Sequence, residues 1–486
     1  MDCIKKSKIK NQKLKLKVFS KQNLIISIVV LLGIVLRLYK IGSKSLWLDE
    51  ACSVYLAKLS LSEMLSQIVK TDIHPPFYNL LLHFWIIPNT SEWYVHLLSA
   101  LFSIITIWIV YLIGKNLFSQ KAGIIAGLIT SISSYQIYYA QEARLYALIT
   151  LLCMFSLLTL IHVLKKPATK TWVLFSIINI IALYTYIYSV FFIIGEYIVA
   201  IWFLKSAKNS MKMILSTMLG TCLGFVPWIL VLFSRKVEIV NLTKPFELSS
   251  IIIMLPQFIL GYFLLQTGLT AILAFILFAI IIAMGVFYDR HNKNIYLLLL
   301  LTALPIIMAI LSPFRTTYFQ SKHLIFLSPI IYLLIALAIT RISKKIISLL
   351  ILISILLLNL TCLRTYYSRD FVKENWKDAA LFVSKNFIPD DVICYSPSYA
   401  GFGFDYYDKT GFEKYGLNKD DIPRTLLNII NTRKRIWLIQ NTSAVTTPNP
   451  EVKRIFEKNC KAKISKQYKG FVGNIDLMLY EKQNIM

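Results

Sequence analysis

The stretch Leu46-Trp47-Leu48-Asp49-Glu50-Ala51 lies just beyond the first apolar segment, residues 24–39, and begins a loop that runs to about residue 94. Two adjacent carboxylates so close to an apolar segment call for a reason. Like charges side by side raise the pKa of at least one member of the pair, which suits a general base. A second interpretation is that Asp49 and Glu50 cap a helix that begins at Ala51, where the helix dipole favours acidic residues. The dipeptide alone favours this second interpretation.

The composition indicates a membrane protein. The chain has 486 residues, 57% of them hydrophobic and 16% charged, with a mean hydropathy of +0.62. Apolar runs long enough to cross a hydrocarbon core of roughly 30 Å recur as far as residue 362. The net charge of +27 could suggest a nucleic-acid partner, but the positive residues lie mainly at the N-terminus and in short links between the apolar runs. Topology rules place positive charge there, so no nucleic-acid partner is expected.

The N-terminal segment predicts the orientation. Residues 1–23 are rich in lysine and form a basic tail, which the positive-inside rule places in the cytoplasm. The apolar run that follows, residues 24–39, has no small-residue cleavage site behind it, so it is interpreted as a retained anchor rather than a signal peptide. The N-terminus is then cytoplasmic, and Asp49 and Glu50 face the exoplasm.

The first loop, residues 43–94, carries structure of its own. Ser60 and Glu63 form a capping-box pattern. The helix that follows is expected to lie in the membrane interface, because its apolar residues share one face. His74-Pro75-Pro76 ends this helix, and residues 77–87 predict a second apolar helix that is too short to span. The residues on the shared face are Leu61, Met64, Leu65, Ile68 and Val69.

The remaining apolar runs predict a polytopic α-helical membrane domain over residues 24–362. The segment 251–266 is ambiguous, because a crossing there would place the basic residues near 290 and 341–345 outside. A re-entrant or interfacial segment returns both clusters to the cytoplasm, and we adopt that option, which leaves about eleven spans. The spans expected after the first are 95–118, 122–134, 145–164, 172–186, 190–204, 211–233, 269–287, 295–311, 324–340 and 346–360.

Residues 363–486 have the composition of a soluble domain, and the predicted topology places them in the exoplasm. Strand-like and helix-like segments alternate there, which predicts a small α/β domain. Gly401-Phe402-Gly403 lacks the third glycine and the acidic residue of a nucleotide-binding fingerprint. A disulfide between Cys394 and Cys460 is the less favoured of two possibilities. The expected strands are 392–395, 436–439 and 475–480, and the expected helices are 378–387 and 424–432.

Three polar groups fall on the predicted exoplasmic side: Asp49 with Glu50, the link 138–146, and the segment 315–323. Taken singly, the second is interpreted as an aromatic belt with a snorkelling arginine, and the third as ordinary charges at the flank of a span. Taken together, they place acids and cations on one side of the membrane. Transfer of a group from a phosphate leaving group needs this combination.

At this point the sequence resembles a known family. Trp47-Leu48-Asp49-Glu50-Ala51, then His74-Pro75-Pro76-Phe77-Tyr78, then Tyr138-Tyr139-Ala140-Gln141-Glu142-Ala143-Arg144-Leu145-Tyr146-Ala147 resemble motifs of the GT-C membrane glycosyltransferases. The branch it looks like is that of the protein O-mannosyltransferase and aminoarabinose transferase relatives. Asn375-Trp376-Lys377-Asp378-Ala379-Ala380 is similar to the start of the extra domain that many of these proteins carry.

The resemblance implies an inverting hexosyl- or pentosyltransferase that uses a polyprenyl-phosphate-linked sugar at the exoplasmic face. The acceptor could be a cell-wall polymer, a lipid or a protein. Asp49 would be the general base, Glu50 its helper or a metal or water partner, and Glu142 a group that orients the acceptor or Arg144. Arg144, Lys322 and His323 would stabilise the leaving phosphate, with the last two in place of the Arg-Tyr pair common in relatives. We place His74, Tyr139, Tyr146 and Arg37 with the substrate-binding residues.

Several alternatives stay open at this stage. Glu196 lies within an apolar span, where a carboxylate is either functional or protonated and hydrogen-bonded to Asn179 or a tyrosine, and we favour the second. Arg37 either snorkels or supports the Asp49 loop. His74 and Glu50 could contribute to a divalent-cation site. A transporter or flippase for lipid-linked sugars is the rival function, because Glu196 is the kind of midplane charge that transporters use.

Overall fold

The computed structural model describes residues 22–483 except 73, 205–207, 235–246, 248, 265–266, 312–319, 410, 418–421 and 444–446. Residues 1–21 of the basic tail and residues 315–319 of the segment 315–323 therefore lie outside the described residues. The chain divides into two compact units. The helical unit comprises Met1–Tyr39, Leu65–Tyr78 and His96–Tyr366, and the mixed unit comprises Lys40–Met64, Asn79–Val95 and Tyr367–Met486.

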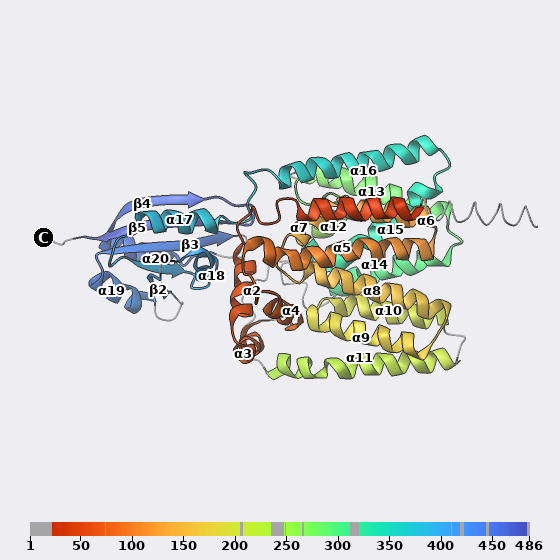
Figure 1. The fold of residues 1–486 in the computed structure, drawn as a ribbon, viewed down its shortest axis with the longest axis horizontal. Helices are drawn as coiled ribbons and strands as arrows, with labels where there is room; N and C mark the ends of the chain where they lie inside the picture. The colour runs from red at the N-terminus through yellow and green to blue at the C-terminus, as the bar shows by residue number, and fades with distance from the viewer. Residues whose placement is uncertain are drawn as a thin grey trace, which may run out of the picture. The chain divides into compact units, whose positions relative to one another are not determined.

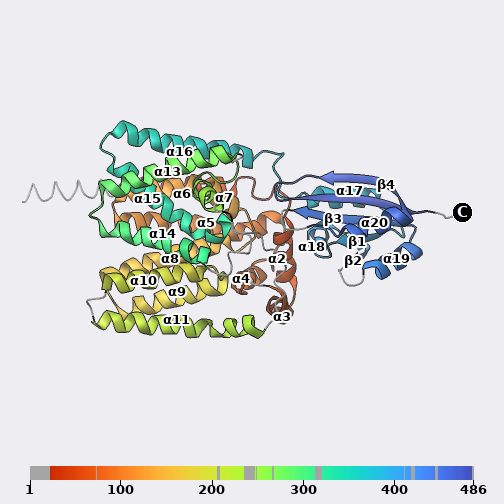
Figure 2. The same ribbon diagram turned by 180° about the vertical axis from the view of Figure 1, so that it is seen from behind.

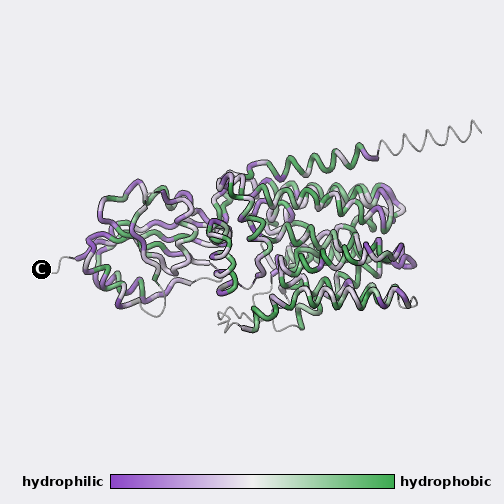
Figure 3. Tube along the Cα trace, turned by 60° about the horizontal axis from the view of Figure 1, so that its bottom comes forward, coloured by the Kyte–Doolittle hydropathy of each residue, from purple (hydrophilic) through white to green (hydrophobic). Residues whose placement is uncertain are grey.

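The helical unit is a bundle of apolar helices that run roughly side by side, with α11 along one edge and α16 along the opposite edge (Figures 1 and 2). Their apolar character along most of their length is visible in Figure 3. The chain contributes, in order, Gln22–Leu38, α5 (Glu92–Leu117), α6 (Gln120–Ile132), α7 (Ser134–Ala140), α8 (Tyr146–Lys165), α9 (Thr169–Thr185), α10 (Ser189–Leu204), α11 (Lys208–Ser234), α12 (Ser249–Leu260), α13 (Gly268–Tyr288), α14 (Lys293–Leu311), the 3-10 helix η2 (Ser321–Leu327) with α15 (Ser328–Arg341), and α16 (Lys345–Tyr366).

The prediction of a multi-pass helical membrane protein is confirmed. Among the described residues, seven helices are long and apolar enough to cross a membrane, and five apolar helices are shorter. α12 has 12 residues, which corresponds to about 18 Å and is too short to cross a core of about 30 Å. That length agrees with the expectation that this segment does not span, while the total of about eleven spans stays a prediction.

Burial separates the centre of the bundle from its rim. In the most apolar stretch of Ser321–Arg341, 89% of the residues are buried. In the corresponding stretches of Gly268–Tyr288 and Lys345–Tyr366, the buried share is only 22%. Helices that expose apolar side chains over most of their surface are stable where lipid replaces water. α15 is therefore the central helix of the unit, and α13 and α16 present apolar faces that suit a bilayer.

The mixed unit is built on a five-stranded sheet of order β2-β1-β3-β5-β4. β1 pairs in parallel with β2 and β3, and β5 pairs antiparallel with β3 and β4. The strands are β1 (Val392–Ser396), β2 (Glu413–Gly416), β3 (Arg435–Ser443), β4 (Cys460–Tyr468) and β5 (Gly473–Lys482). The helices of the tail are α17 (Trp376–Asn386), α18 (Ala400–Tyr407), α19 (Ile422–Thr432) and α20 (Pro450–Asn459).

Helices cover both faces of the sheet, so the predicted α/β domain is confirmed. One core cluster joins α17 and α18 to one face of β1, β3 and β5, and a second joins α19 and α20 to the other face. Alternate strand residues point to opposite faces, so Ile393 belongs to the first cluster and Cys394 to the second. Cys394 and Cys460 are both free thiols, so they form no disulfide.

The strands β2 and β4 and the helices α18 and α20 were not predicted. β2 is only four residues long, and β4 is an edge strand whose lysines leave no apolar alternation. Charged side chains on an edge strand protect it from pairing with other chains, and they also hide it from pattern analysis. Gly401-Phe402-Gly403 lies inside α18, where Gly403 packs directly against the indole of Trp376.

The first loop forms three short helices: α2 (Leu48–Lys58), α3 (Leu61–Thr71) and α4 (Phe77–Trp85). The capping box is confirmed, because Glu63 Oε2 accepts from the Ser60 amide at 3.2 Å and Glu63 N–H donates to Ser60 Oγ at 3.4 Å. Met64 and Ile68 are fully buried, as their shared face predicted. The expectation that α2 begins at Ala51 was wrong by three residues, since Leu48, Asp49 and Glu50 form its first turn.

Candidate active site

The link between α7 and α8 carries two of the predicted site residues and is held firmly at one end of the helical unit. The side-chain amide of Gln141 donates to the carbonyl oxygens of Arg37 and Tyr39, at 2.7 and 2.8 Å. The hydroxyl of Tyr366 donates to Gln141 Oε1 at 3.0 Å. These bonds join the link to the last turn of the first helix and to the end of α16, so the position of the next residues is well defined.

Glu142 and Arg144 follow within a tight turn, in which the Arg144 amide donates to the Glu142 carbonyl at 2.8 Å. The Glu142 side chain is buried and interacts electrostatically with Tyr139. The Arg144 carbonyl accepts from Ser99 Oγ at 3.4 Å, and its guanidinium interacts electrostatically with Tyr186. An acid and a guanidinium thus lie two residues apart, each beside a tyrosine.

Aromatic side chains connect this turn to the histidines. The rings of Tyr139 and Tyr146 lie 4.9 Å apart, and Tyr146 contacts Tyr186 at 6.2 Å. The hydroxyl of Tyr186 is 2.5 Å from His323 Nδ1, and the rings of Tyr186 and His74 are 5.1 Å apart. The structure therefore brings together His74, Tyr139, Tyr146 and His323, which come from three different segments of the chain.

Lys322 belongs to the same region of the helical unit. It interacts electrostatically with Tyr262, whose hydroxyl lies 2.6 Å from that of Tyr139. Tyr186, Tyr262 and Tyr188, whose ring stacks on that of His323 at 4.8 Å, were not predicted as site residues. The only signal for them was their position at or near the ends of apolar runs, and an interfacial aromatic belt gives the same pattern.

The guanidinium group of Arg37 is buried in the bundle and donates hydrogen bonds to a serine hydroxyl and to backbone carbonyls. Its Nε donates to Ser103 Oγ at 2.8 Å, and its Nη atoms donate to the carbonyls of Ser131 at 2.9 Å, Thr130 at 3.0 Å and Gly33 at 3.3 Å. Ser131 and Thr130 are in the last turn of α6, where carbonyl groups lack intrahelical partners. Arg37 is thus engaged as a cap for α6, and its expected contact with substrate stays a prediction.

Glu196 is engaged in a small polar cluster within the bundle. Ser156 Oγ lies 2.7 Å from both Glu196 Oε2 and Asn179 Oδ1. Ser156 is the donor in both contacts, so the carboxyl group of Glu196 is engaged within the bundle. The protonated state favoured from the sequence stays a prediction.

The acidic pair lies in the mixed unit, on the first turn of α2. Glu50 is 1% exposed, and its carboxylate accepts from the Trp47 amide at 3.2 Å. Asp49 is half-buried, and its carbonyl accepts from Ser53 Oγ at 2.9 Å. Glu50 therefore caps the start of α2, as the second interpretation of the acidic pair expected. The side chain of Asp49 is partly exposed in the same turn.

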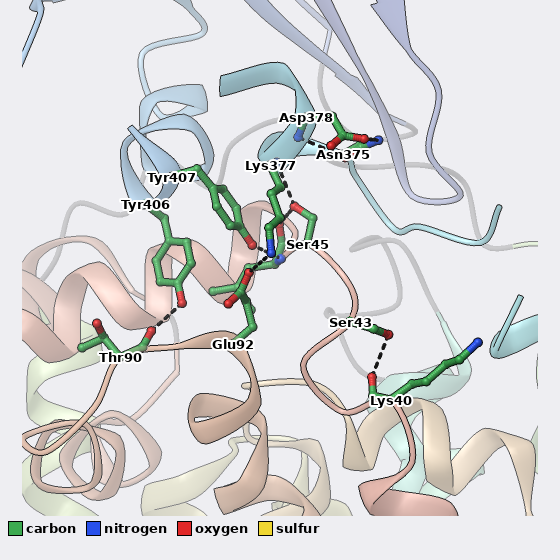
Figure 4. Close-up of polar contacts among 11 residues, drawn as sticks. Lys40, Ser43, Ser45, Thr90, Glu92, Asn375, Lys377, Asp378, Tyr406 and Tyr407 are labelled. Carbon is green, nitrogen blue, oxygen red and sulfur yellow. Dashed lines mark hydrogen bonds and ion pairs between the residues drawn. The ribbon is translucent and has the colours of Figure 1, made fainter. Parts of the chain in front are cut away.

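The loop that carries this pair is bound to the tail by several polar contacts (Figure 4). The Lys377 amide donates to Ser45 Oγ at 3.3 Å, and its ammonium group forms an ion pair with Glu92 at 2.9 Å. Tyr406 donates to the Thr90 carbonyl at 2.5 Å, and the Leu46 amide donates to the Tyr407 hydroxyl at 2.8 Å. Residues on both sides of the acidic pair thus belong to the same compact unit as the sheet.

A basic group accompanies the acidic pair within the mixed unit. Burial, together with the like charges of Lys373 and Lys40, lowers the pKa of Lys44 to about 6. The ammonium group of Lys44 lies over the ring of Phe371 at 4.4 Å, and that of Lys373 lies over the ring of Trp47 at 5.9 Å. At neutral pH Lys44 is therefore largely uncharged.

The predicted site residues divide between the two units. Glu142, Arg144, Lys322 and the aromatic and histidine residues belong to the helical unit, and Asp49 and Glu50 to the mixed unit. In the described ranges, no group of three or more His, Cys, Asp or Glu side chains is arranged to hold a metal ion. The expected divalent cation, with His74 and Glu50 as ligands, stays a prediction.

Comparisons with known proteins concern both units. A family model described as dolichyl-phosphate-mannose-protein mannosyltransferase matches residues 73–231, about a third of the chain. The comparison with curated proteins finds no match. Among solved structures, ArnT from Cupriavidus metallidurans bound to undecaprenyl phosphate is similar with a TM-score of 0.60 and 11% identity, over 93% of this chain and 97% of that chain.

Two further structures are similar over most of this chain. The archaeal oligosaccharyltransferase AglB from Archaeoglobus fulgidus, in complex with an inhibitory peptide and a dolichol-phosphate, has a TM-score of 0.51 and 12% identity, over 95% of this chain and 74% of that one. The arabinofuranosyltransferase AftD from Mycobacteria has a TM-score of 0.54 and 11% identity, over 94% of this chain and 41% of that one. At such identities the likeness is one of fold.

Proposed function

We propose, on the premise that this chain is a membrane protein of the GT-C glycosyltransferase fold, that it transfers a sugar from a polyprenyl-phosphate-linked donor to an exoplasmic acceptor with inversion at the anomeric carbon. The observation that carries the proposal is the cluster in the helical unit. There Arg144, Tyr186 and His323 converge from three segments of the chain beside Tyr139 and Glu142.

The cluster suits the departure of a phosphate. Guanidinium groups bind phosphate through paired hydrogen bonds, and ammonium and imidazolium groups add positive charge. We assign this role to Arg144, Lys322 and His323. Tyr139 and Tyr146 form an aromatic surface next to these cations, and aromatic faces suit the apolar side of a sugar ring or a prenyl chain.

The acceptor needs a base, and we assign that role to Asp49. Glu50 is buried and already accepts from a backbone amide, whereas Asp49 is half-buried on the same helical turn. As the acceptor oxygen forms a bond to the anomeric carbon, Asp49 takes the proton from the acceptor hydroxyl. The bond from the anomeric carbon to the phosphate oxygen breaks at the same time, and the polyprenyl phosphate leaves with the electron pair. A carboxylate on one face of the sugar also helps an oxocarbenium-like state.

The names of the similar structures support a lipid-linked donor. ArnT was solved with undecaprenyl phosphate and AglB with a dolichol-phosphate. A donor of this kind brings its tail into the bilayer, which fits a site at the end of a bundle of apolar helices. The acceptor stays open among a cell-wall polymer, a membrane lipid and a protein.

A transporter or flippase for lipid-linked sugars is the rival function. Such proteins place their working charges near the membrane midplane, on interrupted helices. Glu196 is the feature that would favour this function, but its carboxyl group is engaged with Ser156, which also contacts Asn179. The acids and cations described above lie instead on loops and short helices.

The decisive experiment incubates purified protein with a radiolabelled polyprenyl-phosphate sugar and candidate acceptors. Asp49→Asn should remain folded but lose transfer, while Glu63→Gln, an exposed acid of the same loop, should retain it. A parallel reaction with a chelator tests the expected divalent cation. Transfer by Asp49→Asn at near the normal rate would remove the proposed base, and donor uptake without a new glycosidic bond would favour the transporter.

A further inference from the structure

One buried carboxylate of the tail is bonded directly to the helix that carries the acidic pair. Glu374 is 1% exposed and lies just before α17. Its Oε2 accepts from the Leu48 amide at 2.8 Å and from the indole nitrogen of Trp376 at 2.7 Å. Its Oε1 accepts from the side-chain amide of Asn441 at 3.1 Å. Leu48 is the first residue of α2 and the neighbour of Asp49.

The contacts of Glu374 suit a carboxyl group rather than an amide. All three partners are N–H donors, and together they use both oxygens of Glu374. A glutamine has only one oxygen, so its NH₂ group would face one of the three donors at close range. An aspartate is one methylene shorter and could not reach all three partners from the same backbone position. Only glutamate satisfies the three donors at the observed distances.

The rest of α2 is held by the same part of the chain. The Leu48 side chain packs against the core cluster that contains Trp376 and Trp437. The rings of Tyr55 and Phe402 lie 4.7 Å apart, which joins α2 to α18. The helix that carries Asp49 is therefore built into the sheet domain, and Glu374 bonds directly to the first residue of that helix.

We propose that Glu374 is a positioning residue, which holds the first turn of α2 so that the carboxylate of Asp49 is presented in one orientation to the acceptor. This inference rests on the proposed function, because it assumes that Asp49 acts as the base. It also makes the sheet domain a working part of the transferase, since the contact that orients the base comes from the tail.

Glu374 and Asp49 also interact through their charges. Burial raises the pKa of Glu374, and the nearby charge of Asp49 raises it further. The other charged groups of the mixed unit in these segments are Glu50 on α2, Lys373 next to Glu374, and the Glu92–Lys377 ion pair, whereas Lys44 ahead of α2 is largely uncharged at neutral pH.

The test compares Glu374→Gln with a matched control, Asp391→Asn. Asp391 is a buried carboxylate of the same domain that accepts from the indole nitrogen of Trp437 at 3.0 Å and pairs with Arg435 at 2.9 Å. No described contact joins it to α2. Both variants should lose similar thermal stability. Only Glu374→Gln should lower kcat, by about 10- to 100-fold, because small displacements of a catalytic group have effects of this size.

A further measurement separates positioning from a loss of stability. Hydrogen exchange in a peptide that covers residues 47–53 should become faster in Glu374→Gln and not in Asp391→Asn, because only Glu374 bonds to the start of α2. The exchange measurement needs no activity, so it tests the contact even if no suitable acceptor is known.

The outcomes distinguish this inference from the proposed function. If Glu374→Gln matches Asp391→Asn in kcat and in exchange while Asp49→Asn is inactive, the positioning role is wrong and the transferase proposal stands. If Asp49→Asn keeps normal transfer, the proposed base is wrong, and with it the inference that depends on it. Unchanged exchange at α2 in Glu374→Gln would overturn the positioning role by itself.

Discussion

Replacing Arg37 by methionine tests whether this residue holds the bundle together or binds substrate. Arg37 is fully buried, and three of its bonds are 3.0 Å or shorter: those to Ser103 Oγ and to the carbonyls of Ser131 and Thr130. The amide of Ser134, which would continue α6 by bonding to Thr130, donates to Asn359 instead at 2.9 Å. Without Arg37, the carbonyls at the end of α6 lose a partner in a place that water does not reach.

The size of the effect follows from those bonds. Interhelical hydrogen bonds in membrane proteins average about 0.6 kcal/mol, and bonds from charged donors are worth about 1.5–3 kcal/mol. Three such bonds give limits of roughly 2 and 9 kcal/mol. We expect a loss of about 3–5 kcal/mol for Arg37→Met, which is the usual cost of removing one member of a buried charged network. Ser103→Ala, which removes one bond, should lose about 0.5–1.5 kcal/mol.

The assay follows unfolding in mixed micelles as the fraction of denaturing detergent rises, together with donor kinetics of the folded protein. A structural role predicts a large loss of stability and an unchanged KM for the donor in the fraction that stays folded. The reasoning would be refuted if Arg37→Met unfolded within about 1 kcal/mol of the natural protein. A tenfold rise in donor KM at normal stability would instead establish the substrate contact expected from the sequence.

Three other predictions concern single side chains. The amine of Lys44 should react with an acylating reagent with a midpoint near pH 6, as the pKa of about 6 implies; a midpoint above pH 9 would contradict its burial beside like charges. The Lys44 amine stays protonated up to about pH 10.5 in the unfolded chain but only up to about pH 6 in the folded protein. The free energy of unfolding should therefore rise with pH between these two values, and Lys44→Met should reduce that slope. Arg144→Ala should chiefly raise the donor KM, measured with varied lipid-linked sugar; unchanged kinetics would remove its phosphate role. Glu196→Gln should leave sugar transfer within about twofold of normal, because the amide oxygen of glutamine can accept the bond from Ser156 that the carboxyl oxygen accepts; abolished transfer or transport would make Glu196 functional.

The bundle was predictable because a membrane span is a local property of the chain. Span boundaries such as 145–164 and 269–287 agree with α8 and α13 within a few residues, since the length of an apolar run determines whether a helix can cross. The capping box at Ser60 and Glu63 was predictable for the same reason, because its partners are three residues apart. The alternation of apolar and polar residues did not predict β4, because its lysines leave no such alternation.

The site was predictable only in part. The motifs named Asp49, Glu142 and Arg144, but they could not tell which member of the acidic pair would be used to cap α2. That difference depends on burial, which places Glu50 inside the mixed unit and leaves Asp49 half-buried. The tyrosines that join Arg144 to His323 had no distinctive pattern, because aromatic residues at span ends are common in any membrane protein.

By itself the sequence determined the apolar helices, the soluble tail and the residue types that a transferase of this kind needs. These follow from periodicity, run length and short motifs, which act over a few residues. Only the tertiary structure decided that Glu374 would bind the amide of Leu48, 326 residues away along the chain, and that residues 40–64 and 79–95 would form one compact unit with the tail. Such contacts depend on how distant segments pack together, and no local pattern in the chain records which donor a buried carboxylate will meet.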